Sequence, residues 1–445
     1  MNESHEALLA RVRARDPGEP EFHQAVEEVL ASLWPFLQQN PAYRQRALLE
    51  RLLEPERVLM FRVPWVDDSG RVHVNRGFRV QMNSAIGPYK GGLRFHPSVT
   101  LGTLKFLAFE QTFKNALTTL PMGGGKGGAD FDPKGRSDDE VMRFCQSFMC
   151  ELFRHIGPDT DVPAGDIGVG SREIAFMFGM YRKLRNEVTG SFTGKGLAFG
   201  GSEVRPQATG FGLVYFVEEM LRTRQRQLGG LRVAISGAGN VALHAAQQAM
   251  ASGARVVTLS DSGGTVHCPA GLSDEQWRAL VTVKNERRGR VSDFAAAQGL
   301  AYHAGVRPWQ FPCDVALPCA TQNELDAADA QALLDNGCFC VAEGANMPAT
   351  PDAARLLRRA RILYAPSKAA NAGGVAVSGL EMTQNALHQQ WPRPEVDARL
   401  RRIMADIHAA CRQHGENGDG IDYVAGANIA GFIRVADAMI AQGIV

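Results

Sequence analysis

The pattern of hydrophobic and polar positions divides the first two hundred residues into helical and extended stretches. Residues 1 to about 55 have the periodicity of helices, with a turn predicted at Asp16-Pro17-Gly18-Glu19-Pro20. Residues 56–82 show short apolar bursts, broken at 67–70 and at 76–77, which predicts a meander of strands. From there to about residue 195 we expect helices that alternate with glycine-rich loops.

The second half of the chain begins with a strand, a loop, a helix and a second strand. The glycine-rich stretch Phe199-Gly200-Gly201-Ser202 fits a hinge between domains. A short apolar strand is predicted at 231–236, a helical run then reaches Ser252, and a second strand is predicted at 255–259. Helical sequence returns from about residue 380 to the end.

The loop of this pattern has the spacing of a dinucleotide-binding motif. Gly237-Ala238-Gly239-Asn240-Val241-Ala242 is a GxGxxA sequence, and Asp261 follows 24 positions after its first glycine. Such glycines let backbone amides approach a pyrophosphate at a helix N-terminus. Because a strand is predicted before the loop and a helix after it, we interpret it as a Rossmann-type site. The alternative is a tight turn that binds no ligand.

Composition limits the classes of partner. A chain of 445 residues is too long for one compact core, so two domains are expected. The formal net charge is +1, which provides no field to attract nucleic acid or an anionic membrane. No apolar run approaches the length of a membrane span, and residues 1–16 lack a hydrophobic signal core. We therefore expect a cytoplasmic protein that binds neither nucleic acid nor a membrane.

The cysteines and histidines do not form a metal-binding pattern. Eight cysteines are present, and Cys338-Phe339-Cys340 has one residue between its sulfurs and no histidine nearby. Zinc sites use wider spacings and more ligands. Buried, reduced thiols and no metal are therefore expected.

Candidate chemistry is concentrated in Pro121-Met122-Gly123-Gly124-Gly125-Lys126-Gly127-Gly128-Ala129-Asp130, where one lysine lies among five glycines. A lysine held there would lose solvation, which lowers its pKa and suits it to acid–base work. Asp166, in the turn at 163–168, is the candidate partner for proton transfer. A nucleotide P-loop is excluded because Gly127, and not Ser or Thr, follows the lysine. The alternative is a mobile surface loop with a solvated lysine.

Two further lysines lie close in sequence. Lys90 begins the string Lys90-Gly91-Gly92-Leu93-Arg94-Phe95-His96-Pro97, and Lys114 lies in a helical stretch three residues after Gln111, on the same helix face. Three cations and an amide near one point predict a pocket for a small dianion.

At these residues the chain resembles the hexameric glutamate dehydrogenases. The matching strings are KGGLRFHPSV, EQTFKNALTTLPMGGGKGGADFDPKG, VPAGDIGVG and NAGGVAVSGLEMTQN, and the resemblance covers nearly the whole chain. It implies an α/β fold with a substrate-binding and oligomerisation domain at 1–200, a Rossmann NADP-binding domain at 201–421 and a cleft between them. It also implies a C-terminal helix at about 422–445 that packs back on the first domain, and a homohexamer.

The resemblance implies reversible, NADPH-dependent amination of 2-oxoglutarate with ammonia to L-glutamate. Lys126 would polarise the carbonyl and Asp166 would move protons. Lys90 and Ser378 would bind the γ-carboxylate, and Gln111 and Lys114 the α-carboxylate, although by residue type alone Ser378 favours a turn. Further substrate and cofactor contacts are implied for Gly165, Thr209, Gly237, Gly239, Asn240, Val241, Asn346 and Asn371.

The sequence favours NADP(H) over NAD(H), although two features conflict. Asp261 at the end of the second strand is typical of a ribose-binding acid, which favours NAD. However, Ser262 and the basic run at 281–290 offer the several donors that a 2′-phosphate needs. In that run Lys284, Arg287 and Arg290 have the spacing of the NADP-specific glutamate dehydrogenases. A solvated helix face is the alternative interpretation of these charges.

Two other functions are compatible with parts of the sequence. One is a leucine, valine or phenylalanine dehydrogenase of the same superfamily, in which apolar residues replace the ligands of the γ-carboxylate. Lys90 and Ser378 argue against it. The other is a dinucleotide-binding protein without chemistry, which would be expected to lose Lys126 or Asp166.

Overall fold

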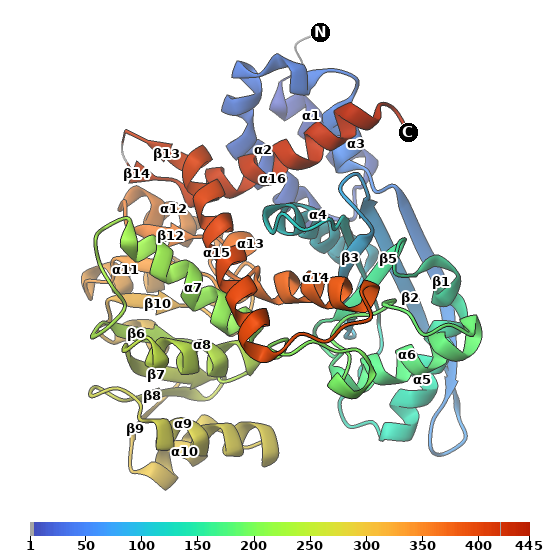
Figure 1. Cartoon of the computed structure of the whole chain (residues 1–445). Helices are drawn as coiled ribbons and strands as arrows, with labels where there is room; N and C mark the ends of the chain where they lie inside the picture. The colour runs from blue at the N-terminus through green and yellow to red at the C-terminus, as the bar shows by residue number, and fades with distance from the viewer. Residues whose placement is uncertain (1–3, 419) are drawn as a thin grey trace. The chain divides into compact units, whose positions relative to one another are not determined.

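The structure is a computed structural model that describes residues 4–418 and 420–445. The chain forms two compact units (Figure 1). Unit 1 contains the residues up to Arg205 together with Val375–Val396 and Asn428–Val445, and unit 2 contains Pro206–Gly374 and Asp397–Ala427. This division differs from the sequence prediction, which placed all of 201–421 in the second domain.

The difference arises at helix α14 (Gly373–Ala386). Its Glu381 accepts a hydrogen bond from the backbone of Gly194 at 2.9 Å and pairs with Nζ of Lys195 at 2.7 Å. Both charged side chains are almost fully buried, so this part of the helix is held in unit 1.

Unit 1 is built on a five-stranded sheet with the order β1-β2-β4-β3-β5. The strands are β1 (Arg57–Val66), β2 (Val72–Asn83), β3 (Tyr89–Phe95), β4 (Gly124–Ala129) and β5 (Asp161–Gly165). β2 pairs antiparallel with β1 and β4, whereas β3 runs parallel to both β4 and β5. The carboxyl ends of β3, β4 and β5 therefore lie at one edge of the sheet.

Two sequence predictions were wrong in this sheet. The break expected at 76–77 lies inside β2, because Gly77 is opposite Phe61 and leaves room for its ring. The segment expected to be a glycine-rich loop is strand β4. Its glycines permit close packing: a Cβ on Gly124 would lie 2.0 Å from Oγ1 of Thr112, on the helix that covers the strand.

The side chain of Arg79 crosses β4 and forms a buried ion pair between β2 and β5. Nε of Arg79, on β2, donates to Oδ2 of Asp161, on β5, at 2.9 Å, and both side chains are 0% exposed. A Cβ on Gly125 would lie 3.3 Å from an Arg79 nitrogen, and one on Gly127 would lie 3.0 Å from Cδ of Arg79. The arginine therefore passes over β4 where that strand has no side chains.

Helices cover the sheet of unit 1. They are α1 (His5–Arg15), α2 (Pro20–Gln39), α3 (Leu48–Leu53), α4 (Leu101–Leu117), α5 (Asp138–Leu152), α6 (Ser171–Arg185), most of α14, and the larger part of α16 (Tyr423–Gln442). α4 packs on β4 and β2, and α5 packs on β1 and α6. Phe95, Phe131, Phe144 and Phe148 form an aromatic core between these layers.

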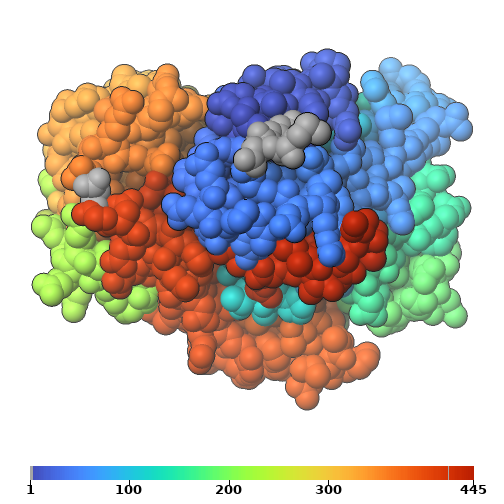
Figure 2. Space-filling view, turned by 90° about the horizontal axis from the view of Figure 1, so that it is seen from above, coloured from blue at the N-terminus to red at the C-terminus, as the bar shows by residue number. Residues whose placement is uncertain are grey.

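The C-terminal helix packs on the N-terminal helices (Figure 2). The ring of Phe432 contacts those of Phe36 and Tyr43, and Tyr43 donates to Asp437 at 2.8 Å. Among the described residues α16 is long and apolar enough to span a membrane, contrary to the sequence prediction, but 50% of its most apolar window is buried inside the protein.

Unit 2 is built on a seven-stranded sheet with the order β12-β11-β10-β6-β7-β8-β9. The strands are β6 (Arg232–Ile235), β7 (Arg255–Asp261), β8 (Gly264–His267), β9 (Ala301–Ala304), β10 (Val315–Leu317), β11 (Cys340–Ala342) and β12 (Leu363–Ala365). The five strands from β12 to β7 are parallel, and β8 and β9 are antiparallel additions. The strand–helix–strand pattern predicted from 231 to 259 is confirmed.

Helices connect the strands of unit 2. They are α7 (Ala208–Arg222), α8 (Asn240–Ala251), α9 (Asp274–Val281), α10 (Val291–Gln298), α11 (Ala327–Asp335), α12 (Pro351–Arg359), α13 (Ser367–Ala370) and most of α15 (Arg393–Gly415). A short hairpin, β13 (Glu416–Asn417) with β14 (Gly420–Ile421), joins α15 to α16.

Arg79→Met should lower the free energy of unfolding by about 3–5 kcal/mol, because it leaves the buried carboxylate of Asp161 without its partner. Denaturation by guanidinium, at one protein concentration for all variants, measures this loss. Arg76→Met is the matched control, since Arg76 lies on the same strand with its side chain 71% exposed. Equal unfolding midpoints for the two variants would contradict a structural role for the buried pair.

Candidate active site

Three charged side chains of unit 1 meet at the carboxyl ends of its parallel strands. Lys126 lies on β4, Arg94 lies near the end of β3, and Asp166 directly follows β5. Nζ of Lys126 is 3.3 Å from Oδ2 of Asp166, and Nε of Arg94 donates to the same oxygen at 2.7 Å. The structure thus brings together the predicted pair and adds an arginine that the sequence analysis did not select.

The backbone of this cluster requires glycine at two positions. A Cβ on Gly92 would lie 2.9 Å from Cβ of Asp166. A Cβ on Gly165 would lie 2.5 Å from the carbonyl oxygen of Val169, in the tight turn that presents the aspartate. The predicted contact of Gly165 with substrate stays a prediction.

Burial and paired charges set the protonation of the cluster. Burial lowers the pKa of Lys126; the negative charge of Asp166 opposes this effect and the positive charge of Arg94 adds to it. Burial alone would raise the pKa of Asp166, but Lys126 and Arg94 outweigh it and lower that pKa to about 2. Asp166 is therefore a carboxylate at neutral pH. The pKa of Lys126 is lowered, which makes it easier for this lysine to release a proton.

Lys90 and Arg205 form a second group of cations in unit 1, and Arg205 contacts Ser378. Nε of Arg205 donates to Oγ of Ser378 at 3.0 Å, and Lys90 is 1% exposed. Burial lowers the pKa of Lys90 well below its usual value, and the nearby charge of Arg205 lowers it further. Ser378 lies inside α14, which corrects the turn that its residue type favoured.

The charges of Lys90 and Arg205 favour the binding of an anion. The ion pairs seen among the described residues place Glu381 with Lys195 and Asp161 with Arg79, and they assign no carboxylate to Lys90 or Arg205. A fully buried cation, Lys90, beside the partly buried Arg205 is costly unless an anion joins them. A bound carboxylate would also restore the charge of Lys90.

Helix α4 supplies the other residues that were predicted for substrate binding. Nε2 of Gln111 donates to Oδ1 of Asn115 at 2.6 Å, and Lys114 lies half-buried on the same helix. Asn115 is 0% exposed and donates to the carbonyl oxygens of Lys90, at 2.9 Å, and Gly123, at 2.5 Å. It fastens α4 to β3 and to the start of the glycine strand, a role that the sequence analysis missed.

In unit 2 the GxGxxA loop has the geometry of a phosphate-binding turn. Gly237 has φ +82°, and a Cβ on it would meet Ala320 at 3.1 Å. Gly239 caps α8, and a Cβ built on it would have nothing within 4 Å, so the approach to the helix N-terminus is open. Asn240 and Val241 begin α8, as the motif predicted.

Asp261 holds the basic segment in place with both of its carboxylate oxygens. Oδ1 accepts from the backbone N–H of Gly263 and Oδ2 from that of Val291, each at 2.9 Å. Val291 is the first residue of α10, where a negative charge is favourable. Nζ of Lys284 is 3.9 Å from Oδ2.

Most of the predicted phosphate ligands gather beside this carboxylate. Arg290 donates to Oγ of Ser262 at 2.8 Å, and Lys284 donates to the carbonyl oxygen of Gly289 at 2.8 Å. Arg287 is exposed, and the hydrogen bonds and ion pairs seen among the described residues do not join it to Asp261 or Ser262. The basic run is therefore a folded cluster around the end of β7 and not a straight helix face.

Two asparagines and the start of α7 complete the predicted cofactor residues. Asn371 donates through Nδ2 to Oδ1 of Asn346 at 3.1 Å, while its own buried Oδ1 has no hydrogen-bond partner in the structure. Asn240 donates to the carbonyl oxygen of Pro206 at 2.6 Å, near Thr209 in the first turn of α7. An unsatisfied buried acceptor is costly, so Asn371 fits a ligand that brings an N–H, such as a carboxamide.

Comparison with known proteins finds family models that match both the N-terminal and the C-terminal part of the chain. The family model "Glutamate/Leucine/Phenylalanine/Valine dehydrogenase" matches residues 200–443, and "Glu/Leu/Phe/Val dehydrogenase, dimerisation domain" matches 55–183. The chain belongs to this family. The resemblance proposed from the sequence motifs is thereby confirmed.

Individual relatives span nearly the whole chain. It is 62% identical over 442 residues to the NADP-specific glutamate dehydrogenase of Escherichia coli, covering 99% of both chains. It is 56% identical over 442 residues, again 99% of both chains, to the NAD-specific glutamate dehydrogenase of Bacteroides fragilis. The structure of Plasmodium falciparum glutamate dehydrogenase matches with a TM-score of 0.97 at 50% identity, covering 99% of this chain and 95% of that one.

In this Glu/Leu/Phe/Val dehydrogenase, Lys284→Ala combined with Arg290→Ala should weaken NADPH binding at least tenfold and leave NADH binding nearly unchanged. Each charge-assisted contact with the 2′-phosphate contributes roughly 1.5–3 kcal/mol, and 1.4 kcal/mol is about tenfold. Fluorescence titration with each reduced dinucleotide measures the two affinities. Arg288→Ala, in the same exposed run, is the control. An equal loss for NADH and NADPH would contradict a 2′-phosphate role.

Proposed function

We propose that the protein is an NADP(H)-dependent glutamate dehydrogenase, which catalyses the reversible conversion of 2-oxoglutarate, ammonium, NADPH and a proton to L-glutamate, NADP⁺ and water. The observation that carries the proposal is a pair of neighbouring cations, the buried Lys90 and the partly buried Arg205, which donates to Ser378, in the same unit as Lys126 and Asp166. One cationic group suits the distal carboxylate of a dicarboxylic acid, and the other suits its reacting carbonyl. The E. coli relative carries the same name.

Lys126 acts on the carbonyl of the 2-oxo acid. Its ammonium donates a proton or a hydrogen bond to the carbonyl oxygen, where negative charge develops as nitrogen attacks. Because Lys126 is 4% exposed, water competes little with this interaction. Its lowered pKa also makes the proton easier to transfer.

Asp166 acts on nitrogen. As a carboxylate with a pKa of about 2, it attracts the ammonium ion electrostatically and accepts a hydrogen bond from it. A carboxylate of this pKa holds a proton only briefly at neutral pH, so Asp166 passes protons on and does not store them. Arg94, at 2.7 Å, keeps the group ionised and oriented.

The bound cofactor supplies and accepts hydride. Gly237, Gly239 and the N-terminus of α8 would hold its pyrophosphate, and Ser262, Lys284 and Arg290 its 2′-phosphate. Asp261 keeps its negative charge, but Nζ of Lys284 lies 3.9 Å from it and backbone N–H groups donate to both of its oxygens, which reduces its repulsion of the phosphate. This arrangement supports NADP(H), although the B. fragilis relative is NAD-specific.

The alternative substrates of the family are apolar amino acids. An apolar side chain would leave the buried Lys90 and the partly buried Arg205 without a substrate anion, which is unfavourable above all for the buried ammonium. A dinucleotide-binding protein without chemistry would have no use for the cluster of Lys126, Arg94 and Asp166. Both alternatives are therefore less well supported than glutamate.

We also propose a homohexamer, whose contacts include the outer face of β1 and β2. Met60, Val72 and Val74 are 65%, 70% and 62% exposed. The register places them on one face of the antiparallel pair, and β1 is an edge strand. Exposed apolar rows of this kind mark protein interfaces, and the matching family model at 55–183 is named for dimerisation.

We propose a cytoplasmic location. All eight cysteines are free and seven of them are buried. Such thiols suit a reducing compartment.

Lys126→Ala should reduce turnover at least about 10²–10³-fold, the usual loss for one oxyanion donor, and should leave NADPH affinity unchanged. The assay follows NADPH absorbance with 2-oxoglutarate and ammonium, and NADH is run separately. Lys134→Ala, on an exposed turn, is the control. Retention of more than about a tenth of the wild-type turnover would remove Lys126 from the reaction, and wild-type activity on leucine but not glutamate would overturn the proposed substrate.

The pH dependence should identify the lysine. Activity that needs protonated Lys126 falls as the pH rises through its pKa. Arg94→Gln removes a charge that lowers the pKa of Lys126, so that pKa should rise and the alkaline limb of kcat/KM should move to higher pH. The profile is measured with 2-oxoglutarate at saturating ammonia and NADPH. A limb that moves to lower pH would show that another group titrates.

Met60→Lys combined with Val74→Lys should reduce the size of the assembly, because two charges would be buried in the proposed contact. Light scattering on a sizing column measures the mass. Ile444→Lys, at a residue 72% exposed elsewhere in unit 1, is the control. An unchanged mass would place the subunit contacts on other surfaces.

A further inference from the structure

Helix α14 carries Ser378 and, one turn further along, a buried carboxylate, Glu381. Ser378 is 1% exposed and Glu381 is 0% exposed. Residues three apart are neighbours on one face of a helix, so the two side chains point to the same side of α14. The contacts that hold Glu381 therefore also determine where Ser378 lies.

Glu381 pairs with Lys195, and both charged groups are fully hydrogen-bonded. Nζ of Lys195 lies 2.7 Å from Oε1 of Glu381. It also donates to Oδ1 of Asn385, at 2.8 Å, and to the carbonyl oxygen of Phe192. These are three acceptors, which is the number that an ammonium group can serve. Oε2 of Glu381 accepts from the backbone N–H of Gly194 at 2.9 Å.

Two more residues of α14 fasten the helix to the segment that leads to Arg205. Asn385 donates through Nδ2 to the carbonyl oxygen of Gly200 at 2.7 Å. Gln384 donates through Nε2 to Oγ of Ser202 at 2.8 Å. Arg205 follows only three residues later in the chain. The helix that carries Ser378 therefore also holds the backbone from which Arg205 reaches it.

The negative charge of Glu381 acts on both cations of the anion-binding group. Burial has the largest effect on the pKa of Lys90 and lowers it. The positive charges of Arg205 and Arg79 lower this pKa further, whereas the negative charges of Glu381 and Asp161 raise it. Burial also lowers the pKa of Arg205, and the charge of Glu381 opposes that effect. Asp161 is already paired with Arg79, so Glu381 is the carboxylate whose charge reaches both Lys90 and Arg205.

Packing alone does not require charges at positions 195 and 381. The cost of taking two charges out of water is comparable to the attraction between them, so an apolar pair of similar volume would hold the helix equally well. An apolar pair would, however, remove the negative charge that acts on Lys90 and Arg205. A role in the anion-binding group accounts for the charges of the pair.

We propose that Glu381, held by Lys195, is a positioning residue for the group that binds the distal carboxylate of the substrate. It fixes Ser378 through the helix and Arg205 through the segment 194–202. Its charge stabilises the two cations until the carboxylate of the substrate joins them. The inference rests on the proposed function, because it takes the substrate to be a dicarboxylic 2-oxo acid.

The first experiment measures substrate preference in Glu381→Gln, which keeps the shape of the side chain and removes its charge. The value of kcat/KM is determined for 2-oxoglutarate and for 2-oxopentanoate, which has the same carbon chain without the distal carboxylate. The preference for 2-oxoglutarate should fall at least about tenfold, and the KM for NADPH should not change. A general loss of folded protein would lower activity on both substrates alike.

The second experiment separates the charge of Glu381 from its packing. Calorimetry measures the affinity for glutarate, which has both carboxylates and no carbonyl, as a function of pH. This affinity needs charged Lys90, so it falls as the pH rises through the pKa of Lys90. Glu381→Gln removes a charge that raises this pKa, so the fall should move to lower pH. Lys195→Met removes the cation that offsets Glu381, so the fall should move to higher pH.

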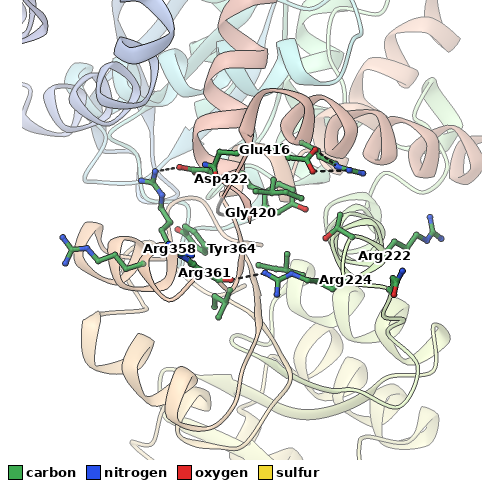
Figure 3. Close-up of a pocket in the computed structure, with 17 residues that line it drawn as sticks. Arg222, Arg224, Arg358, Arg361, Tyr364, Glu416, Gly420 and Asp422 are labelled. Atoms are coloured by element: carbon green, nitrogen blue, oxygen red, sulfur yellow. Dashed lines mark hydrogen bonds and ion pairs between the residues drawn. The ribbon is translucent and has the colours of Figure 1, made fainter.

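Two control variants remove a carboxylate charge elsewhere. Glu173→Gln is the matched control, because Glu173 is a buried carboxylate of unit 1 that also pairs with a cation, Arg172. Glu416→Gln breaks an exposed pair with Arg412 at a cavity of unit 2 (Figure 3). Neither variant should change the substrate preference or the pH dependence.

The double variant Lys195→Met with Glu381→Gln leaves no lone buried charge at the pair, and it decides the preference measurement if a single variant does not fold. The inference is overturned if Glu381→Gln or the double variant keeps the full preference for 2-oxoglutarate. It is also overturned if the two single variants move the pH dependence in the same direction, as a loosened helix would. An unmodified protein that does not aminate 2-oxoglutarate would instead overturn the proposed function.

Discussion

The architecture of the candidate active site depends on one buried ion pair. Arg79 reaches from β2 to Asp161 on β5 and must pass β4 and β3, which lie between them in the sheet. It can do so because Gly125 and Gly127 have no side chains on its path. The pair is costly to desolvate and costlier still to break, so it fixes the strands relative to one another more firmly than sheet hydrogen bonds alone. Lys126, between those two glycines, is placed by the same constraint.

The charges of unit 1 then divide into two classes. The carboxylates of Asp161, Glu381 and Asp166 are each held by a cation from the protein. Lys90 is buried and Arg205 donates to the hydroxyl of Ser378, and the ion pairs seen among the described residues give neither of them a carboxylate. Under the proposed function a substrate anion would balance these two cations, whose arrangement exists without it. This is the preorganisation that makes a fixed ammonium effective in stabilising developing charge.

The sequence allowed the Rossmann unit to be predicted and selected Lys126 and Asp166, which the structure brings together, but it did not predict the local structure around them. The GxGxxA loop was predictable because glycine spacing, strand and helix lie within one short stretch. The strand β4 was mistaken for a loop, because glycines usually indicate flexibility and their real cause, the crossing of Arg79 and the close packing of Thr112, involves residues distant in sequence. Arg94 stood inside a quoted motif, but its contact with Asp166 spans 72 positions.

Asp261 shows why residue type at a motif position does not settle cofactor preference. A carboxylate at the end of this strand can accept hydrogen bonds from ribose hydroxyls or from protein backbone, but one oxygen cannot be fully used by both. Here Gly263 and Val291 already donate to its two oxygens. The same contacts anchor the N-terminus of α10 and so bring Arg290 to Ser262, at 2.8 Å. The acid that by itself suggests NAD thus positions the donors proposed for a 2′-phosphate, while Nζ of Lys284, 3.9 Å away, partly offsets its negative charge.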